Sequence, residues 1–339
     1  MPDYTHLNPQ NRAWYERLGQ RIVGGAQGHK RHTRYLARGG PGVFVRAQGA
    51  YCWDVDGRRF IDYLCGYGPI VLGHCDAEFN AAVFTQMQEA GVLSAEHPRA
   101  IELAEELCRL IPCAEQILYG IGGSSVTSMA LRVARAHTGR ERIIRCGYHG
   151  WHDWCVPTQV GVPQHERELI REVSYGDAAA LERQLDADRG SVAGVIVEAL
   201  QGDLPPADYF ARVRALCDAH GAVFILDEVK TGFRLDIGGA QAALGIRPDL
   251  ATFGKALGNG FPVSVLAGTR AVLAGREACH LAATFHAEPL ACAAGLACLR
   301  LLRARDVIAH QHRLGRQLAD GLNRVFAAHD FPLRIGGHP

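Results

Sequence analysis

The chain has 339 residues, a formal net charge of +1, 48% hydrophobic residues and 21% charged residues. This composition is typical of a globular protein with a sizeable core, and the length accommodates one large α/β domain together with a smaller one. The near-neutral charge and the lack of any lysine-arginine block argue against nucleic acid or an anionic membrane surface as a partner.

Cysteine usage and the N-terminus indicate the cellular compartment. The 11 cysteines are scattered without a CxxC pair, and several lie inside apolar helical patterns. An odd number of such cysteines is typical of reduced, buried thiols and not of a disulfide framework. The N-terminus has no apolar signal region, and no run approaches the ~20 apolar residues that a membrane span needs. These features predict a cytoplasmic protein.

The N-terminal part of the chain is predicted to form one helix and a small antiparallel sheet. The helix spans residues 11–22, and strands follow at 42–46 and 50–55. Asp56-Gly57 is a hairpin turn signal that leads into a third strand at 59–63. Apolar residues at helical spacing predict further helices at 78–88, 98–110, 178–185, 208–220, 289–303 and 307–328. A last strand begins at 333–335.

A glycine- and hydroxyl-rich stretch, Tyr119 to Ser128, runs into a predicted helix at 129–137. Glycines keep the backbone open, and the free N–H groups of a helix N-terminus form an anion site. Taken alone this motif is weak, because it also suits a simple N-capped helix. A short strand is predicted next, at 143–146.

Three apolar runs in the second half of the chain predict buried strands of a parallel sheet, at 192–198, 222–226 and 250–253. A helix between the first two gives the strand–helix–strand order of an α/β sheet. The second run ends in Asp227, and the third ends in Gly254-Lys255. Because ligands bind beyond the carboxyl ends of such strands, we expect Asp227 and Lys255 to face one site.

This lysine and carboxylate suit pyridoxal phosphate (PLP). A lysine amine forms a Schiff base with the cofactor, and a carboxylate keeps the pyridinium nitrogen protonated so that the ring can accept electrons. The residues alone leave an alternative open, in which Asp227 caps a turn and Lys255 is a solvated surface lysine.

Two stretches carry a resemblance to a known family. Residues 227–234 (Asp-Glu-Val-Lys-Thr-Gly-Phe-Arg) and 253–263 (Phe-Gly-Lys-Ala-Leu-Gly-Asn-Gly-Phe-Pro-Val) resemble the signature stretches of class III PLP aminotransferases. The resemblance is greatest to the branch that contains glutamate-1-semialdehyde aminomutase and its aminotransferase-like relatives. It implies PLP fold type I, an α/β fold whose large domain has a mainly parallel seven-stranded sheet flanked by helices, together with a smaller domain.

The resemblance also implies a division of the chain. Residues 1–65 contribute to the small domain, 66–285 form the large PLP-binding domain, and 286–339 form a linking helix and the start of a C-terminal small domain. Family members continue with a further C-terminal α/β segment, so we expect this chain to be either naturally short or truncated.

The family's site residues carry over onto matching positions. Lys255 and Asp227 become the catalytic pair. The implied cofactor-binding residues are Gly123, Ser124, Tyr148, His149, Glu198, Asp227, Val229, Lys255 and Thr284. Gly123 and Ser124 match positions that hold the phosphate, and Tyr148 matches an aromatic residue that stacks on the pyridine ring, with Val229 on the opposite ring face.

Thr284 matches a threonine that crosses a dimer interface to the phosphate of the neighbouring subunit, which implies a homodimer with shared sites. It also suits the N-cap of the next helix. For the substrate, Arg31 falls near the arginine that binds a carboxylate in the aminomutase, with Lys30 and Arg34 in competition for that place. Tyr67 matches an aromatic residue beside the substrate. An exposed basic loop and a buried packing tyrosine are the alternatives.

The chain departs from the family pattern at three positions. Ser125 stands where an acid is usual, and Ala199 replaces a proline. Asp203 stands roughly where a polar residue approaches the cofactor's phenolic oxygen. His149 and His152 lie near Asp153, but no further ligand cluster follows, so no metal site is predicted.

These observations predict a PLP-dependent aminotransferase that transfers an amino group to an aldehyde or ketone acceptor through a Lys255 Schiff base. Three alternatives remain: intramolecular transfer by an aminomutase of the glutamate-1-semialdehyde type, an amino-acid epimerase, and a non-catalytic truncated homologue. An aminotransferase needs a second substrate, whereas a mutase or an epimerase acts on one alone. The sequence does not identify the amino donor or the acceptor.

Overall fold

The computed structural model describes residues 8–23 and 43–338. The chain forms two compact units, Met1–Asn80 and Ala81–Pro339. The three-part division implied by the family resemblance stays a prediction.

The first unit contains the predicted helix and antiparallel sheet. Its elements are α1 (Pro9–Arg21), β1 (Phe44–Gln48), β2 (Tyr51–Asp54), β3 (Arg59–Ile61) and the 3₁₀ turn η2 (Cys65–Tyr67). The sheet order is β1-β2-β3, and both pairings are antiparallel. Gly57 adopts φ +78° in the turn after β2, and its N–H donates to the carbonyl of Asp54 at 2.9 Å. The hairpin signal at Asp56-Gly57 is therefore confirmed.

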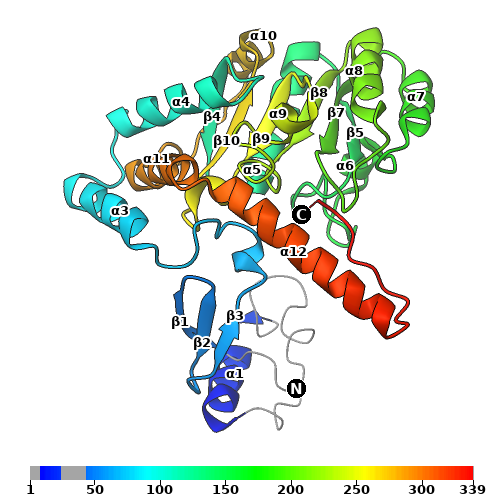
Figure 1. Cartoon of the computed structure of the whole chain (residues 1–339). Helices are drawn as coiled ribbons and strands as arrows, with labels where there is room; N and C mark the ends of the chain where they lie inside the picture. Colours follow the sequence, from blue (N-terminus) through cyan, green and yellow to red (C-terminus); the bar gives the residue numbers. More distant parts are fainter. Residues whose placement is uncertain (1–7, 24–42, 339) are drawn as a thin grey trace. The chain divides into compact units, whose positions relative to one another are not determined.

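The second unit is built on a seven-stranded sheet with the order β4-β10-β9-β8-β7-β5-β6 (Figure 1). Its strands are β4 (Gln116–Gly120), β5 (Arg142–Cys146), β6 (Ile170–Glu172), β7 (Val192–Glu198), β8 (Val223–Asp227), β9 (Leu250–Phe253) and β10 (Ser264–Gly268). β10 runs antiparallel to β4 and β9, and the remaining pairings are parallel. This confirms the predicted α/β fold with a mainly parallel sheet.

Helices surround this sheet. They are α4 (Pro98–Leu110), α5 (Gly123–Thr138), α6 (Gln164–Glu168), α7 (Ala178–Ala187), α8 (Tyr209–His220), α9 (Ala240–Leu244), α10 (Arg270–Leu273), α11 (Pro289–Ala304) and α12 (Val307–Ala328), with α3 (Ala77–Glu89) spanning the boundary between the units. Short 3₁₀ turns are η3 (Lys255–Gly258) and η4 (Ala274–Ala278). Among the described helices, none is both long enough and apolar enough to span a membrane.

The central strands are continuous apolar runs because they are buried along their whole length. Every residue of β8, β9 and β10 is buried, as expected of strands covered on both faces. Helix α5 packs on the sheet through apolar side chains such as Val126 and Ala130, which share one cluster with Ile196 and Ile225. Each fully buried aliphatic side chain of this kind contributes about 1.5–3 kcal/mol. The core therefore fixes the carboxyl ends of β7, β8 and β9 relative to α5.

The strand prediction at 333–335 is wrong. Residues 331–336 have no regular structure. Ile335 instead donates its N–H to Asn323 Oδ1 at 2.8 Å and accepts from Asn323 Nδ2 at 3.1 Å. A side chain of α12 thus satisfies the backbone groups that a strand neighbour would otherwise bind.

Candidate active site

Asp227 and Lys255 lie at the ends of neighbouring strands, as the sequence predicts. Asp227 is the last residue of β8 and pairs in register with Thr252 of β9. Lys255 follows β9 by two residues and opens the turn η3. Its backbone has φ +43°, in the left-handed region that residues other than glycine adopt rarely and often at functional sites. The sheet register therefore carries both side chains to one crevice.

Asp227 is a buried carboxylate, 6% exposed, with donors on both oxygens. Its Oδ1 accepts the N–H of Val229 at 3.0 Å and the hydroxyl of Thr252 at 3.0 Å. Its Oδ2 lies 2.8 Å from Nδ1 of His149, which donates when the ring proton is on that nitrogen. Hydrogen bonds donated to a carboxylate stabilise its negative charge. Asp227 is thus prepared to face a positively charged group.

His149 connects Asp227 to helix α5. Its ring is buried and stacks on Trp154, with ring centroids 5.9 Å apart and an interplanar angle of 14°. Its carbonyl accepts the hydroxyl of Thr127 at 2.8 Å. Nε2 is buried and has no hydrogen-bond partner among the described residues. Because the other ring nitrogen faces Asp227, the imidazole orients that carboxylate.

The start of α5 forms a cradle suited to an anion. The helix begins at Gly123, no side chain caps it, and its first turn contains no acidic residue. A Cβ on Gly123 would lie 2.8 Å from Cγ1 of Val229, so only glycine allows this close approach. The helix N-terminus therefore reaches the segment that follows Asp227, and its N–H groups attract negative charge.

Ser124 and Ser125 differ in their surroundings. Ser124 Oγ accepts the N–H of Trp151 at 3.2 Å, which ties the helix start to the segment that carries Tyr148 and His149. Ser125 Oγ lies 4.0 Å from the sulfur of Met129. The serine that replaces the family's usual acid thus contacts its own helix.

Tyr148 presents an exposed ring, 58% of the residue being accessible. Its N–H donates to Glu198 Oε2 at 3.1 Å. Glu198 ends β7, accepts from Gln201 Nε2 at 2.6 Å, and places Oε1 3.5 Å from Nζ of Lys230. Glu198 therefore positions the backbone of the aromatic residue, which leaves the ring available for stacking.

Burial lowers the pKa of Lys255, the positive charge of Lys230 lowers it further, and the negative charge of Asp227 opposes the change. A lower pKa leaves a larger fraction of the amine neutral near pH 7, and the neutral amine is the nucleophile. The residues present fit PLP: a half-buried lysine, an ionised carboxylate, an exposed aromatic ring and an anion cradle.

Sequence reasoning missed three polar residues of this region: Thr252, Gln201 and Lys230. Thr252 could be found by placing β9 beside β8, since it then lies opposite Asp227. Gln201, and not Asp203, lies against Glu198. Asp203 instead accepts the N–H of Gly337 at 2.9 Å.

Three predicted residues are not brought to Lys255 by the described contacts. Arg31 lies outside the described residues. Tyr67 belongs to the first unit, in η2, with φ +70°. Thr284 is exposed and lines a hollow of about 200 Å³ together with residues such as His97 and His286. It does not cap α11, because Glu288 does so by accepting the N–H groups of residues 290 and 291.

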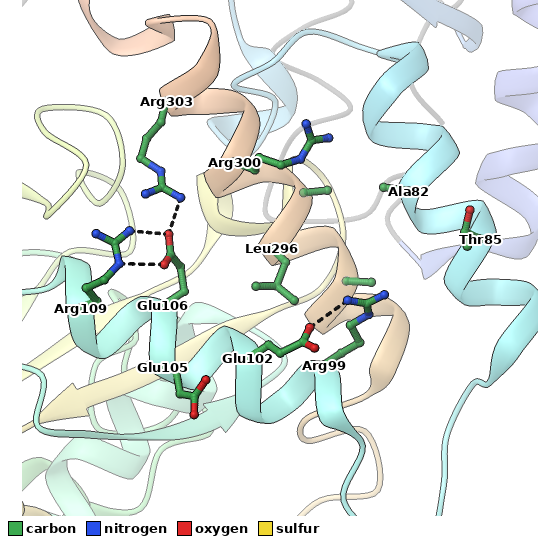
Figure 2. Close-up of a pocket in the computed structure, with 12 residues that line it drawn as sticks. Ala82, Thr85, Arg99, Glu102, Glu105, Glu106, Arg109, Leu296, Arg300 and Arg303 are labelled. Atoms are coloured by element: carbon green, nitrogen blue, oxygen red, sulfur yellow. Dashed lines mark hydrogen bonds and ion pairs between the residues drawn. The ribbon is translucent and has the colours of Figure 1, made fainter.

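Two other features of the second unit serve different purposes. Figure 2 shows a hollow of about 600 Å³ between α4 and α11 that contains none of the predicted site residues. Its charges pair with one another: Glu106 binds both Arg109 and Arg303, and Arg99 binds Glu102. His149 and His152 bind Asp227 and Ser128 through their Nδ1 atoms, so these two nitrogens do not converge.

Comparison with known proteins decides the family. The family described as "Aminotransferase class-III" matches residues 35–338. The chain belongs to the class III aminotransferases. It is 34% identical over 338 residues to the 3-aminobutyryl-CoA aminotransferase of Cloacimonas acidaminovorans (strain Evry), covering 96% of this chain and 80% of that protein.

Solved structures of relatives agree with this class III assignment. The FumI protein of Sphingopyxis sp. MTA144, in its PLP internal aldimine form, superposes with a TM-score of 0.92 at 30% identity, over 95% of this chain and 80% of that one. A β-phenylalanine aminotransferase from Variovorax paradoxus gives a TM-score of 0.83 at 30% identity, over 95% and 75%. The chain is a PLP-dependent class III aminotransferase of fold type I.

Proposed function

We propose that Lys255 attaches the cofactor and carries the proton in this aminotransferase, while Asp227 holds the positive charge of the ring nitrogen. The observation that carries this proposal is the buried carboxylate of Asp227, with three donors around it, on the strand next to the one that leads to Lys255.

PLP, when bound, supplies an aldehyde that condenses with amines and a ring that takes up electrons. Lys255 Nζ, once a substrate amine has displaced it, takes a proton from the substrate carbon and returns it at the neighbouring position. Asp227 stays negative throughout, since its hydrogen bonds stabilise the charged form. Gly123 and Ser124 would hold the phosphate at the α5 N-terminus, and Tyr148 and Val229 would contact the two ring faces.

The second part of the proposal concerns assembly. We infer a homodimer in which Thr284 serves the phosphate site of the partner subunit. Its exposure, and the distance in sequence and structure from the Gly123 cradle implied by its separate hollow, support this assignment. A cytoplasmic location agrees with the 11 cysteines, all of which are free thiols in the described structure.

The third part concerns the substrate. Two of the relatives are named for amino groups on a β-carbon, 3-aminobutyryl-CoA and β-phenylalanine. We infer that the amino donor of this chain likewise carries its amino group on the β-carbon of an acid or thioester. The relatives described above give no support to an aminomutase reaction.

A half-reaction assay tests the proposal. The holoenzyme is mixed with one amine at a time, either β-phenylalanine, 3-aminobutyrate or its CoA thioester, or L-glutamate, and conversion of bound PLP to its pyridoxamine form is followed by absorbance. We expect conversion by at least one β-amino compound, and turnover only after a carbonyl acceptor is added. Conversion by glutamate alone would contradict the substrate class. Isomerisation of glutamate-1-semialdehyde without an acceptor would establish the aminomutase instead.

A further inference from the structure

The first unit contains a cluster of three different ligand side chains that the aminotransferase reaction does not use. The Sγ of Cys52, a carboxylate oxygen of Asp62 and a ring nitrogen of His74 all lie within 4.8 Å of one another. We propose that these three residues bind a divalent cation of the zinc class.

Backbone contacts hold each ligand in place. Cys52 lies on β2 and is 5% exposed. Asp62 follows β3, and its Oδ1 accepts the N–H groups of Leu64 and Cys65 at 3.0 Å each, which directs Oδ2 toward His74. His74 is bonded through both its N–H and its carbonyl to Gly49, at 2.9 and 2.8 Å. The three ligands are therefore positioned before any cation binds.

The geometry is close to that of a tetrahedral site. Nε2 of His74 lies 2.8 Å from Asp62 Oδ2 and 3.7 Å from Cys52 Sγ. One ring nitrogen can direct a proton at only one of these atoms, whereas a cation between them contacts all three. With zinc bond lengths of about 2.0–2.3 Å, tetrahedral ligand atoms lie about 3.4–3.6 Å apart. The sulfur–nitrogen separation already matches, and the nitrogen–oxygen separation has to grow by about half an ångström.

The ligand set selects the cation. A thiolate and an imidazole favour zinc and its softer analogues, whereas magnesium and calcium require oxygen ligands. On binding, the Cys52 thiol releases its proton to solvent as the sulfur–metal bond forms. Three protein ligands leave the fourth position of a tetrahedral cation to water.

The site also has a consequence for the chain around it. Asp62 and His74 stand at the two ends of the segment that contains η2 and Tyr67, and Cys52 anchors them to β2. A bound cation would cross-link both ends of this segment to the sheet. Only the relevance of Tyr67 to the substrate depends on the proposed function, because metal binding is measured without turnover.

Metal analysis of the holoenzyme tests the site. The protein is stripped with a chelator, dialysed against micromolar Zn²⁺ and analysed by mass spectrometry of the metal. We expect about one zinc per chain for the wild type, and at least a tenfold loss of affinity in Cys52→Ser. Cys75→Ser is the matched control, since this exposed thiol follows His74 directly but is not one of the three ligands.

A spectrum of the wild-type protein gives a second readout that needs no variant. Co²⁺ in place of zinc should give the visible bands of a tetrahedral thiolate site, at wavelengths longer than the cofactor's absorbance. The proposal is overturned if the wild type takes up no zinc, if Cys52→Ser keeps it, if Cys75→Ser loses it, or if bound Co²⁺ shows only octahedral oxygen coordination.

Discussion

At the residue scale, the chemistry of the site depends on how Asp227 keeps its charge while buried. Three donors from three different segments surround it: the hydroxyl of Thr252, the N–H of Val229 and the imidazole of His149. A hydrogen bond to a charged group is worth about 1.5–3 kcal/mol, so their sum can offset much of the cost of burial. Asp227 and Lys255 could be predicted from the sequence because each follows a strand. Thr252 could not, since its role depends on which strands are neighbours.

Asp227→Asn should lower kcat/KM at least about 100-fold, which corresponds to about 3 kcal/mol of lost charge stabilisation. The shape of the side chain is kept, so folding is preserved. Thr252→Val removes one donor and keeps the buried volume, and we expect a loss of about tenfold or less. Steady-state kinetics measure both. Equal losses in the two variants would show that the hydroxyl, and not the carboxylate, is the essential group.

Lys230→Gln should raise the pKa of Lys255. Burial lowers that pKa from its ordinary value of 10.5, and Lys230 and Arg234 lower it further, whereas Asp227 and Glu198 raise it. Only the neutral amine reacts with PLP, so the rate at which apoenzyme is reconstituted rises with pH through this pKa. The midpoint of that rise should move to higher pH when the charge of Lys230 is removed.

Arg212→Gln is the matched control for Lys230→Gln. Arg212 is a surface cation of α8 that faces Glu182 at 3.6 Å, and its removal changes the net charge by the same amount. We expect an unchanged midpoint in this variant. A midpoint that stays in place or falls in Lys230→Gln would contradict the role given to Lys230.

At the element scale, the site depends on the distance between the start of α5 and the segment after β8. Gly123 permits that approach, and Gly122 before it stands in open space. The sequence indicated the glycine-rich start of a helix but placed the helix itself from residue 129, whereas α5 begins at Gly123. Glycine and serine weaken the helical pattern at this end, and packing on the sheet overrides that weak local preference.

Gly123→Ala should weaken PLP binding at least tenfold, because its Cβ would force Val229 or α5 to move. Val229 is β-branched and stiff, so overpacking of this kind costs about 1–3 kcal/mol. Gly122→Ala is the control: its φ of −173° suits any residue, and nothing lies within 4 Å of the added Cβ. Titration of apoenzyme with PLP measures both affinities. Equal affinities in the two variants would show that the cradle tolerates a side chain.

The strands show where local patterns suffice and where they fail. β7 and β9 have the predicted bounds, because long apolar runs buried on both faces have a clear signal. β4, β6 and β10 were not predicted as strands. They are three to five residues long, and β4 and β6 are only partly buried, so their pairing with neighbours defines them more than their own sequence does.

At the scale of the whole molecule, the proposed dimer makes a prediction about mixed subunits. Lys255→Ala subunits and Thr284→Val subunits should each form weakly active or inactive homodimers. If Thr284 serves the partner's site, a mixed dimer has one site with both substitutions and one site that is intact. Coexpression with two different tags should therefore restore up to about half of the wild-type activity per mixed dimer, by counting intact sites.

The same experiment distinguishes the alternative. If Thr284 acted within its own subunit, or had no role in the site, mixed dimers would show only the average of the two parent activities. Isolation through both tags excludes the parent homodimers from the assay. Size-exclusion chromatography with light scattering gives the subunit number independently.

The central claim is that Lys255 holds the cofactor, and chemical trapping tests it most directly. The protein is saturated with PLP, reduced with borohydride, digested and mapped by mass spectrometry. We predict a pyridoxyl group on Lys255 and none on the neighbouring Lys230, together with loss of the label in Lys255→Ala. A label on Lys230, or a folded wild-type protein that takes up no label, would contradict the account.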